Sequence, residues 1–259
     1  MLRSLVLGFA LLAPGALDAQ ERARPLAPRL PFGPGELLEY RVHVSIAGNV
    51  GNAVMRVDGP VSPDSALIWV LHFDMDARRG LIRATDRTTS WLDPVRFAVS
   101  RFEKTERHPL SWSSEKVRID LALGTFTDAD SPPAPLGSYL PLDELSFLFF
   151  LRTLPIDRDS TFRFDRHFDP ARNPTFVRVM GEEIVTTPAG IFRTRIVEMD
   201  VRDPKRFRGT GTVRMYIDIG ACRVPVRIES RMPVLGTTTL ILTGWAHPPR
   251  YPGAFHCDG

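Results

Sequence analysis

The chain has 259 residues, of which 43% are hydrophobic and 24% are charged. These values are ordinary for a globular protein and exclude a mostly disordered chain, while 23 prolines and 19 glycines along the length exclude a coiled coil. The 33 basic residues outnumber the 30 acidic residues only slightly. Because nucleic-acid-binding proteins usually carry a much stronger basic excess, we expect no nucleic-acid partner.

The first 19 residues have the pattern of a secretory signal peptide. Arg3 supplies a basic start, residues 5–13 form an apolar run, and small residues lead to Ala19, after which we expect cleavage. The run is shorter than the ~20 residues that a membrane-spanning helix needs. The sequence therefore predicts an exported, periplasmic protein that is not an integral membrane protein.

The remaining chain is predicted to contain one folded domain between two irregular ends. Residues 20–35 are rich in Pro, Arg and Ala and are expected to form a flexible leader, residues 36–246 a single β-rich domain, and residues 247–259 a Pro-rich tail. Cys222 and Cys257 are an even pair in an exported chain, which predicts a disulfide that ties the tail to the domain. Two unpaired thiols are the alternative.

From residue 36 onward, apolar and polar residues alternate in the manner of half-buried strands. The segment 82–91 is polar and rich in threonine, so we expect an edge strand or a solvent-facing strand there, and we expect 128–135 to be a loop. In chain order, strands are predicted around residues 36–46, 53–57, 68–75, 82–91, 97–104, 116–121, 162–168, 176–179, 191–199, 213–217, 224–228 and 238–242.

One helix is predicted near residues 142–154. Asp143 can cap its first turn and Pro155 ends it. The helix is apolar nearly all round, which predicts that it is buried against a sheet or inside a barrel. Together the pattern predicts an all-β, mainly antiparallel fold: a large curled sheet or barrel-like single domain of about a dozen strands with one buried helix.

Four ordered segments carry a resemblance to a known family. They are P-F-G-P-G-E-L-L-E-Y at 31–40, D-E-L-S-F-L-F-F-L-R at 143–152, V-T-T-P-A-G-I-F at 185–192 and R-V-P-V at 223–226. Together they resemble the bacterial family called domain of unknown function 3108. The resemblance implies an exported, β-rich envelope protein and implies no reaction.

The best candidates for catalytic chemistry lie in one predicted strand. His72, Asp74 and Asp76 would share a face of that strand and are plausible ligands for a divalent metal. A polar strand face explains the same alternation. We therefore predict a protein that is not an enzyme, with no cofactor and no bound metal, and keep a metal-assisted hydrolase as a third hypothesis.

Aromatic residues and one arginine form the candidate ligand-binding set. The aromatic residues would suit either an apolar cavity or a filled core. Arg152 lies late in the apolar helix, where it either pairs with an acid on a facing strand or holds an anionic head group. The full set is Trp69, Phe73, Trp91, Phe147, Phe150 and Arg152.

These observations predict a non-catalytic envelope module that binds an apolar or amphipathic ligand, such as a lipid or a lipidated partner. A wide curled sheet with an apolar helix inside motivates this hypothesis. The alternative is a structural or interaction protein of the envelope that binds an envelope protein and no small ligand.

Overall fold

The structure is a computed structural model that describes residues 30–247 except 62–66, 109–110, 205–209 and 233–235. Within these residues, fourteen strands form one sheet in which every paired neighbour is antiparallel. The strands are β1 (Leu37–Val44), β2 (Gly48–Val61), β3 (Ile68–Arg79), β4 (Ile82–Asp93), β5 (Ala98–His108), β6 (Ser111–Asp120), β7 (Thr125–Asp128), β8 (Ala134–Pro135), β9 (Ser160–Phe164), β10 (Thr175–Thr187), β11 (Gly190–Arg202), β12 (Thr210–Asp218), β13 (Pro225–Met232) and β14 (Gly236–Ala246).

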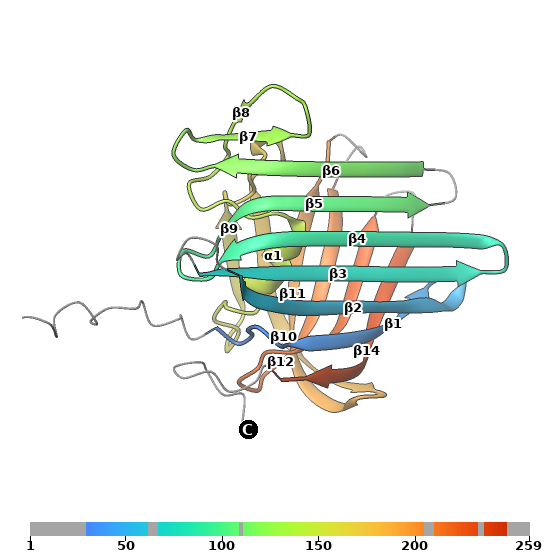
Figure 1. Cartoon of the computed structure of the whole chain (residues 1–259). Helices are drawn as coiled ribbons and strands as arrows, with labels where there is room; N and C mark the ends of the chain where they lie inside the picture. The colour runs from blue at the N-terminus through green and yellow to red at the C-terminus, as the bar shows by residue number, and fades with distance from the viewer. Residues whose placement is uncertain (1–29, 62–66, 109–110, 205–209, 233–235, 248–259) are drawn as a thin grey trace, which may run out of the picture.

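The sheet is a long meander with one exception to sequential pairing. Its order runs from β8 back to β1, and β1 then pairs with β14, from which the order continues back to β9. Strands β1–β6 lie in front in Figure 1, and β10–β13 run crosswise behind them. The outermost strands β8 and β9 do not pair, so the sheet curls without closing. The predicted all-β curled fold is therefore confirmed, with fourteen strands.

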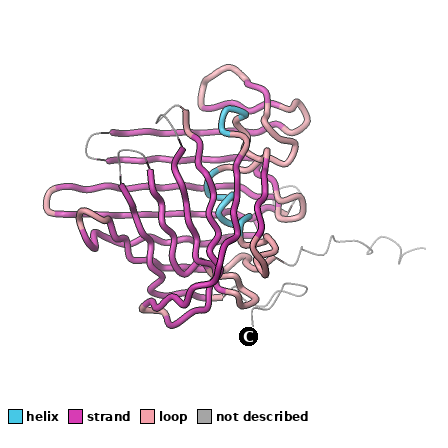
Figure 2. The backbone as a smooth tube through the Cα atoms, turned by 180° about the vertical axis from the view of Figure 1, so that it is seen from behind, coloured by secondary structure: helices cyan, strands magenta, loops and turns pink. Residues whose placement is uncertain are grey.

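Helix α1 (Glu144–Leu151) lies between the two halves of the sheet, as the view from behind also shows (Figures 1 and 2). The Asp143 side chain accepts hydrogen bonds from the backbone N–H groups of Leu145 and Ser146, and the Ser146 hydroxyl accepts from the Asp143 N–H, which completes a capping box. The predicted cap is confirmed. The helix ends three residues earlier than expected, because the residues after Leu151 bond to carbonyls three positions back.

The core fills the space around α1 from both halves of the sheet. Leu38, Leu71 and Phe102 project inward from the front half, and Val197 and Met215 do so from the back half; all five are fully buried. Their alternation with polar residues follows the two-residue period of a strand. The sequence pattern identifies these inward residues because only one face of each strand meets the core.

Two local predictions need correction. The segment 82–91 belongs to β4, which lies between β3 and β5, so the edge-strand alternative is wrong and the alternative of a strand with a solvent-facing side holds. Arg83, Thr85 and Arg87 lie on the outer face, whereas Ser90 and Leu92 are fully buried on the inner face. The segment 128–135 is not loop throughout, since it contains the last residue of β7 and the whole of β8.

Several predictions fall on residues that the structure does not describe. The signal peptide at 1–19, most of the leader at 20–35, Cys257 and most of the tail lie outside the described ranges. The disulfide between Cys222 and Cys257 therefore stays a prediction. Over the residues that are described, no helix combines the length and apolar character needed to cross a membrane.

Candidate functional site

Most of the predicted aromatic set lies around α1. Trp69 is buried with its ring edge-to-face against Phe32, the ring centroids being 6.0 Å apart. Phe150 makes similar contacts with Phe147 at 5.6 Å and with Phe164 at 5.0 Å. Aromatic pairs in this geometry stabilise a core beyond the area they bury. These contacts explain why Trp69, Phe147 and Phe150 pack in or against the core. Their predicted role in binding a ligand stays a prediction.

The other two aromatic residues of the set make no ring–ring contact with these residues in the described part of the chain. Phe73 is half-buried and packs against the core. Trp91 projects from β4 on the face opposite Ser90, and the Arg101 guanidinium carbon lies 4.5 Å from its ring centroid. Trp91 therefore does not join the other predicted ligand-binding residues.

Arg152 follows α1 and is buried in an ion pair. Its Nη1 donates to Glu36 Oε1 at 2.6 Å and its Nη2 donates to Glu36 Oε2 at 2.8 Å. Its remaining donors reach the carbonyl oxygens of Pro31, Cys222 and Arg223 at 2.9–3.1 Å. The Glu36 carboxylate occupies the place that a ligand anion would need. The predicted pairing with an acid is confirmed, and the alternative anion-binding role stays a prediction.

Residues from three of the four family-like segments meet at this ion pair. Glu36 and Tyr40 come from the first segment and Arg152 from the second, while the carbonyl oxygens of Arg223 and Pro225 come from the last. The Tyr40 hydroxyl donates to the Pro225 oxygen at 2.8 Å in a buried position. The segments that carry the resemblance therefore join β1, α1 and β13 at one end of the core.

Each candidate metal ligand of β3 has a charged partner: His72 Nε2 lies 3.1 Å from Asp58 Oδ2, and the two aspartates are paired with arginines. Asp74 contacts Arg56 at 2.7 Å and Arg87 at 3.2 Å, and Asp76 contacts Arg83 at 2.6 Å. The hydrogen bond from Arg83 lowers the pKa of Asp76. Within the described residues, no group of three His, Cys, Asp or Glu side chains is placed to hold a metal ion. These acids therefore anchor arginines on the outer face of the sheet.

A charged network beside the start of α1 was not predicted. Arg172 is buried and contacts Glu144, with Asp203 at 3.2 Å and Glu115 at 3.8 Å, and Lys104 lies 3.3 Å from Glu144. These residues lie on five separate segments and no short motif links them. Such a network fixes the first turn of the helix to both halves of the sheet, which is a structural role.

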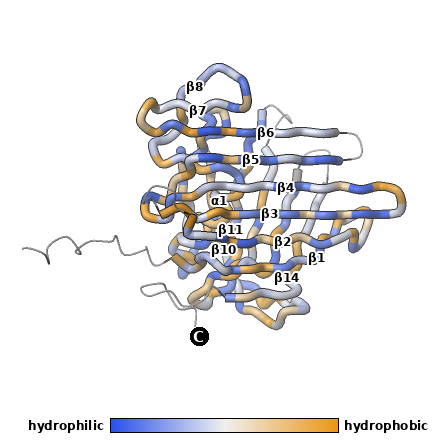
Figure 3. Tube along the Cα trace, in the orientation of Figure 1, coloured by the Kyte–Doolittle hydropathy of each residue, from blue (hydrophilic) through white to orange (hydrophobic). Residues whose placement is uncertain are grey.

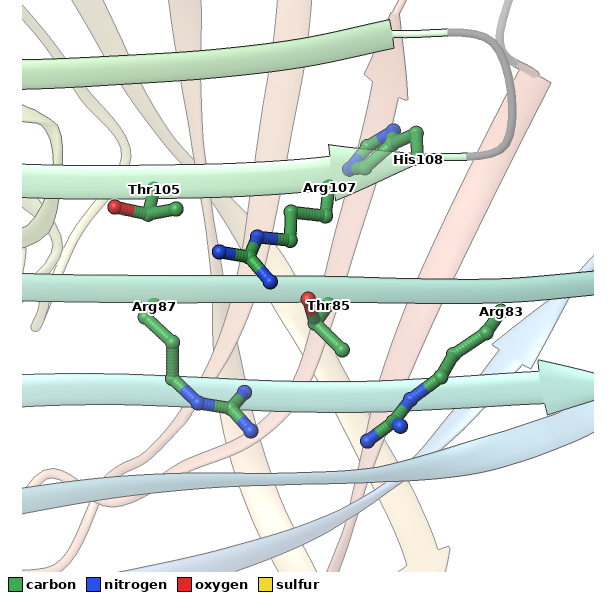
Figure 4. Close-up of a pocket in the computed structure, with 6 residues that line it drawn as sticks. All are labelled: Arg83, Thr85, Arg87, Thr105, Arg107 and His108. Atoms are coloured by element: carbon green, nitrogen blue, oxygen red, sulfur yellow. The ribbon is translucent and has the colours of Figure 1, made fainter.

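A pocket opens on the outer face of the β4–β5 hairpin. Its volume is about 540 Å³. Thr85 lies opposite Arg107 in the β4–β5 register and Arg87 lies opposite Thr105, so alternate residues of both strands meet there. Figure 4 shows the guanidinium groups of Arg83 and Arg87 directed toward β3. The lining residues are Arg83, Thr85, Arg87, Thr105, Arg107 and His108.

The arginines of this pocket differ in their partners. Arg83 donates twice to Asp76, at 2.6 and 3.2 Å, and Arg87 donates to the Met75 carbonyl at 2.6 Å. Arg107 makes no ion pair or side-chain hydrogen bond with any residue in the described ranges. Arg83 and Arg87 are thus held in place, while the donors of Arg107 remain available.

The remaining polar groups of the pocket do not form a reactive set. His108 Nε2 lies 2.7 Å from Asp86 Oδ1, and burial raises the pKa of Asp86, an effect that the hydrogen bond from His108 opposes. No hydroxyl of the pocket threonines is hydrogen-bonded to His108 in the described part of the chain. Guanidinium and hydroxyl groups with no acid among them are suited to holding an oxyanion such as phosphate, sulfate or carboxylate.

Comparison with known proteins adds a family and a fold. The model of a family described as "Protein of unknown function (DUF3108)" matches residues 39–243. No curated protein matches the chain. A beta-barrel-like protein of domain of unknown function DUF1849 from Brucella abortus is 10% identical, with a TM-score of 0.57 over 83% of this chain and 98% of that chain. At this identity the likeness concerns the fold alone.

Two further solved structures are more distant. A Bacteroides fragilis protein with a YmcC-like fold is 15% identical, with a TM-score of 0.28 over 84% of this chain and 98% of that chain. A Parabacteroides distasonis protein is 12% identical, with a TM-score of 0.30 over 84% of this chain and 99% of that chain. Neither score supports an argument about this chain.

Proposed function

We propose that this chain, which belongs to the family of proteins of unknown function DUF3108, is a non-catalytic envelope protein that binds the anionic group of an amphipathic molecule in the β4–β5 pocket. One observation carries the proposal: the pocket is lined by donor side chains, and Arg107 has no acidic partner among the described residues. The signal-peptide pattern of residues 1–19 supports the envelope location.

The arrangement of the pocket favours binding because part of it is already ordered. Asp76 holds Arg83, and Asp74 together with the Met75 carbonyl holds Arg87. An anion that enters the pocket would therefore order mainly Arg107. Ordering fewer side chains lowers the entropic cost of binding.

An exposed aromatic side chain beside the pocket favours an amphipathic ligand over a simple anion. Trp112 lies opposite Arg107 in the β5–β6 register and is 67% exposed. A ligand with its anionic group near Arg107 could place an apolar chain against the Trp112 ring, which would remove that ring from water.

A titration with monomeric lysophospholipids tests the proposal. We expect lysophosphatidylglycerol, below its micelle concentration, to bind more tightly than lysophosphatidylcholine in isothermal titration calorimetry, and added salt to weaken the binding. Arg107→Ala should weaken the binding about tenfold, the loss of one charge-assisted hydrogen bond. Arg41→Ala, which removes an exposed arginine from β1, is the matched control. Equal binding of the two lipids, or equal effects of the two substitutions, would refute the proposal.

An interaction protein without a small ligand is the second candidate. Ile184 and Ile191 are 71% and 73% exposed on the β10–β11 hairpin, and their strand partners place them on the same face. Neighbouring exposed isoleucines on a hairpin suit a contact with another protein. Failure of both lysophospholipids to bind would favour this candidate.

A further inference from the structure

We infer that one edge of the front half of the sheet docks on an anionic lipid bilayer. This edge comprises the β1–β2 turn, the β3–β4 turn and the adjoining ends of β5 and β6, and we call it the hairpin edge. The inference extends the proposed function from a single amphiphile to a membrane surface. It also stands on residues outside the pocket.

The topology brings these segments together. In an antiparallel meander every second turn lies at the same edge, so the β1–β2 and β3–β4 turns and the ends of β5 and β6 share one side. Figure 1 shows them along the right-hand edge, where β3 and β4 extend furthest. Arg79 Nη1 donates to the Ile46 carbonyl at 3.1 Å, which links the first two hairpins directly.

The hairpin edge exposes large apolar side chains on all three hairpins. Leu81 is fully exposed at the β3–β4 turn and Ile46 is 87% exposed at the β1–β2 turn. Trp112, described above, lies next to the pocket, and Ile82 is 59% exposed on the opposite face of β4, beside the β3–β4 turn. Figure 3 shows the hydrophobic tip of the β3–β4 hairpin, with hydrophilic residues behind it. Exposed apolar groups gathered at one edge indicate an interaction surface.

Cationic side chains lie directly behind these apolar tips. Residues 78–83 read Arg-Arg-Gly-Leu-Ile-Arg, without an acid. Arg78 donates to the Gly80 carbonyl at 3.2 Å, which leaves its charge without a carboxylate from the described residues. Arg107 adds a further cation without an acidic partner.

This order of groups matches the depth profile of a bilayer surface. Apolar side chains enter the boundary between head groups and acyl chains, arginines reach the phosphates, and tryptophan favours the interface. Each arginine near an anionic surface adds attraction. The pocket between Arg83 and Arg107 would then hold the head group of one lipid.

Another hairpin provides a contrast. The β10–β11 hairpin also exposes two isoleucines, but there Arg193 pairs with Glu182 at 2.6 Å. The arginine beside its isoleucines therefore has an acidic partner, unlike Arg78 and Arg107 at the hairpin edge. Ile184→Ser/Ile191→Ser therefore removes a similar exposed apolar area without touching the hairpin edge.

Vesicle flotation with the mature protein tests the inference. We expect the protein to float with vesicles of phosphatidylcholine and phosphatidylglycerol (7:3), less with phosphatidylcholine alone, and less in high salt. Leu81→Ser/Ile82→Ser should lower the partition coefficient of the protein between water and vesicles at least about tenfold. Such a loss corresponds to one leucine-sized side chain that is no longer buried in the membrane. Ile184→Ser/Ile191→Ser should leave it unchanged. Quenching of tryptophan fluorescence by brominated lipid should fall in Trp112→Phe.

The outcomes separate this inference from the proposed function. Absence of vesicle binding, or equal losses in the Leu81→Ser/Ile82→Ser and Ile184→Ser/Ile191→Ser variants, would overturn docking at the hairpin edge. If lysophosphatidylglycerol still bound as a monomer, the proposed function would stand without it. Conversely, vesicle binding that depends on Leu81 and Ile82, together with no monomer binding, would support docking and refute the pocket. Circular dichroism checks that each variant is folded.

Discussion

Breaking the buried ion pair between Arg152 and Glu36 should be among the most destabilising single changes in this protein. The side chains are 1% and 4% exposed, and the guanidinium donates to the carboxylate and to three backbone carbonyls. Arg152→Met keeps a long apolar side chain but leaves the Glu36 carboxylate buried without its partner. A buried charge left without its partner costs much more than the net contribution of the intact pair.

The magnitude can be worked out from these contacts. Removing one partner of a buried ion pair costs about 3–5 kcal/mol, a large share of the roughly 5–15 kcal/mol by which proteins are stable. For a chain of this size the dependence on urea is near the upper end of the usual range, about 3 kcal/mol per molar. Arg152→Met should therefore lower the urea midpoint by about 1–1.7 M.

A double-mutant cycle separates the ion pair from simple loss of packing. Urea unfolding of Arg152→Met, Glu36→Leu and the double variant gives the coupling between the two side chains. We expect the double variant to be more stable than Arg152→Met alone, because it no longer buries an unpaired carboxylate. Losses that simply add in the double variant would show that the two charges are not coupled, and would refute this reasoning.

Three further predictions concern titration and covalent linkage. Burial raises the pKa of Asp143 to about 7, so between about pH 4 and 7 the folded protein holds a proton that the unfolded chain releases. The free energy of unfolding should therefore rise as the pH falls from about 7 to 4. Asp143→Asn should flatten that part of a pH–stability curve. Burial lowers the pKa of His167 to about 4, so as the pH falls the unfolded chain binds a proton on this residue before the folded protein does. The free energy of unfolding should therefore fall between about pH 6.5 and 4. His167→Gln should remove that loss from the pH–stability curve. If Cys222 and Cys257 are joined, the intact mass of the purified protein should lack two thiol hydrogens until a reductant is added.

Much of the fold could be predicted because it depends on local patterns. The alternation around Leu38 and Tyr40 identifies the inward face of β1, and both residues are buried there. Asp143 precedes an apolar run, and a short polar side chain at that position caps a helix. For β4 the sequence left an edge strand and a solvent-facing strand open, because a central strand whose outer face meets water has the same polar alternation as an edge strand.

The candidate site could not be predicted, because it depends on register between strands. Thr85 meets Arg107 only when β4 and β5 pair in one alignment, and the sequence does not fix that alignment. The same limit applies to Arg172, whose partners lie on distant segments. The pairing of Arg152 with an acid could be predicted from its apolar surroundings, but the identity of that acid as Glu36 required the structure.

The two faces of β4 have different roles, because the inner face packs in the core and the outer face lines the pocket. Thr88 and Ser90 face the core and are buried, whereas Arg83, Thr85 and Arg87 face outward. Substitutions on the outer face should therefore change the unfolding free energy by no more than about 0.5 kcal/mol, the usual range for exposed sites. Loss of binding in a variant such as Arg107→Ala can then be attributed to the pocket, because the inward face that holds the sheet to α1 is unchanged.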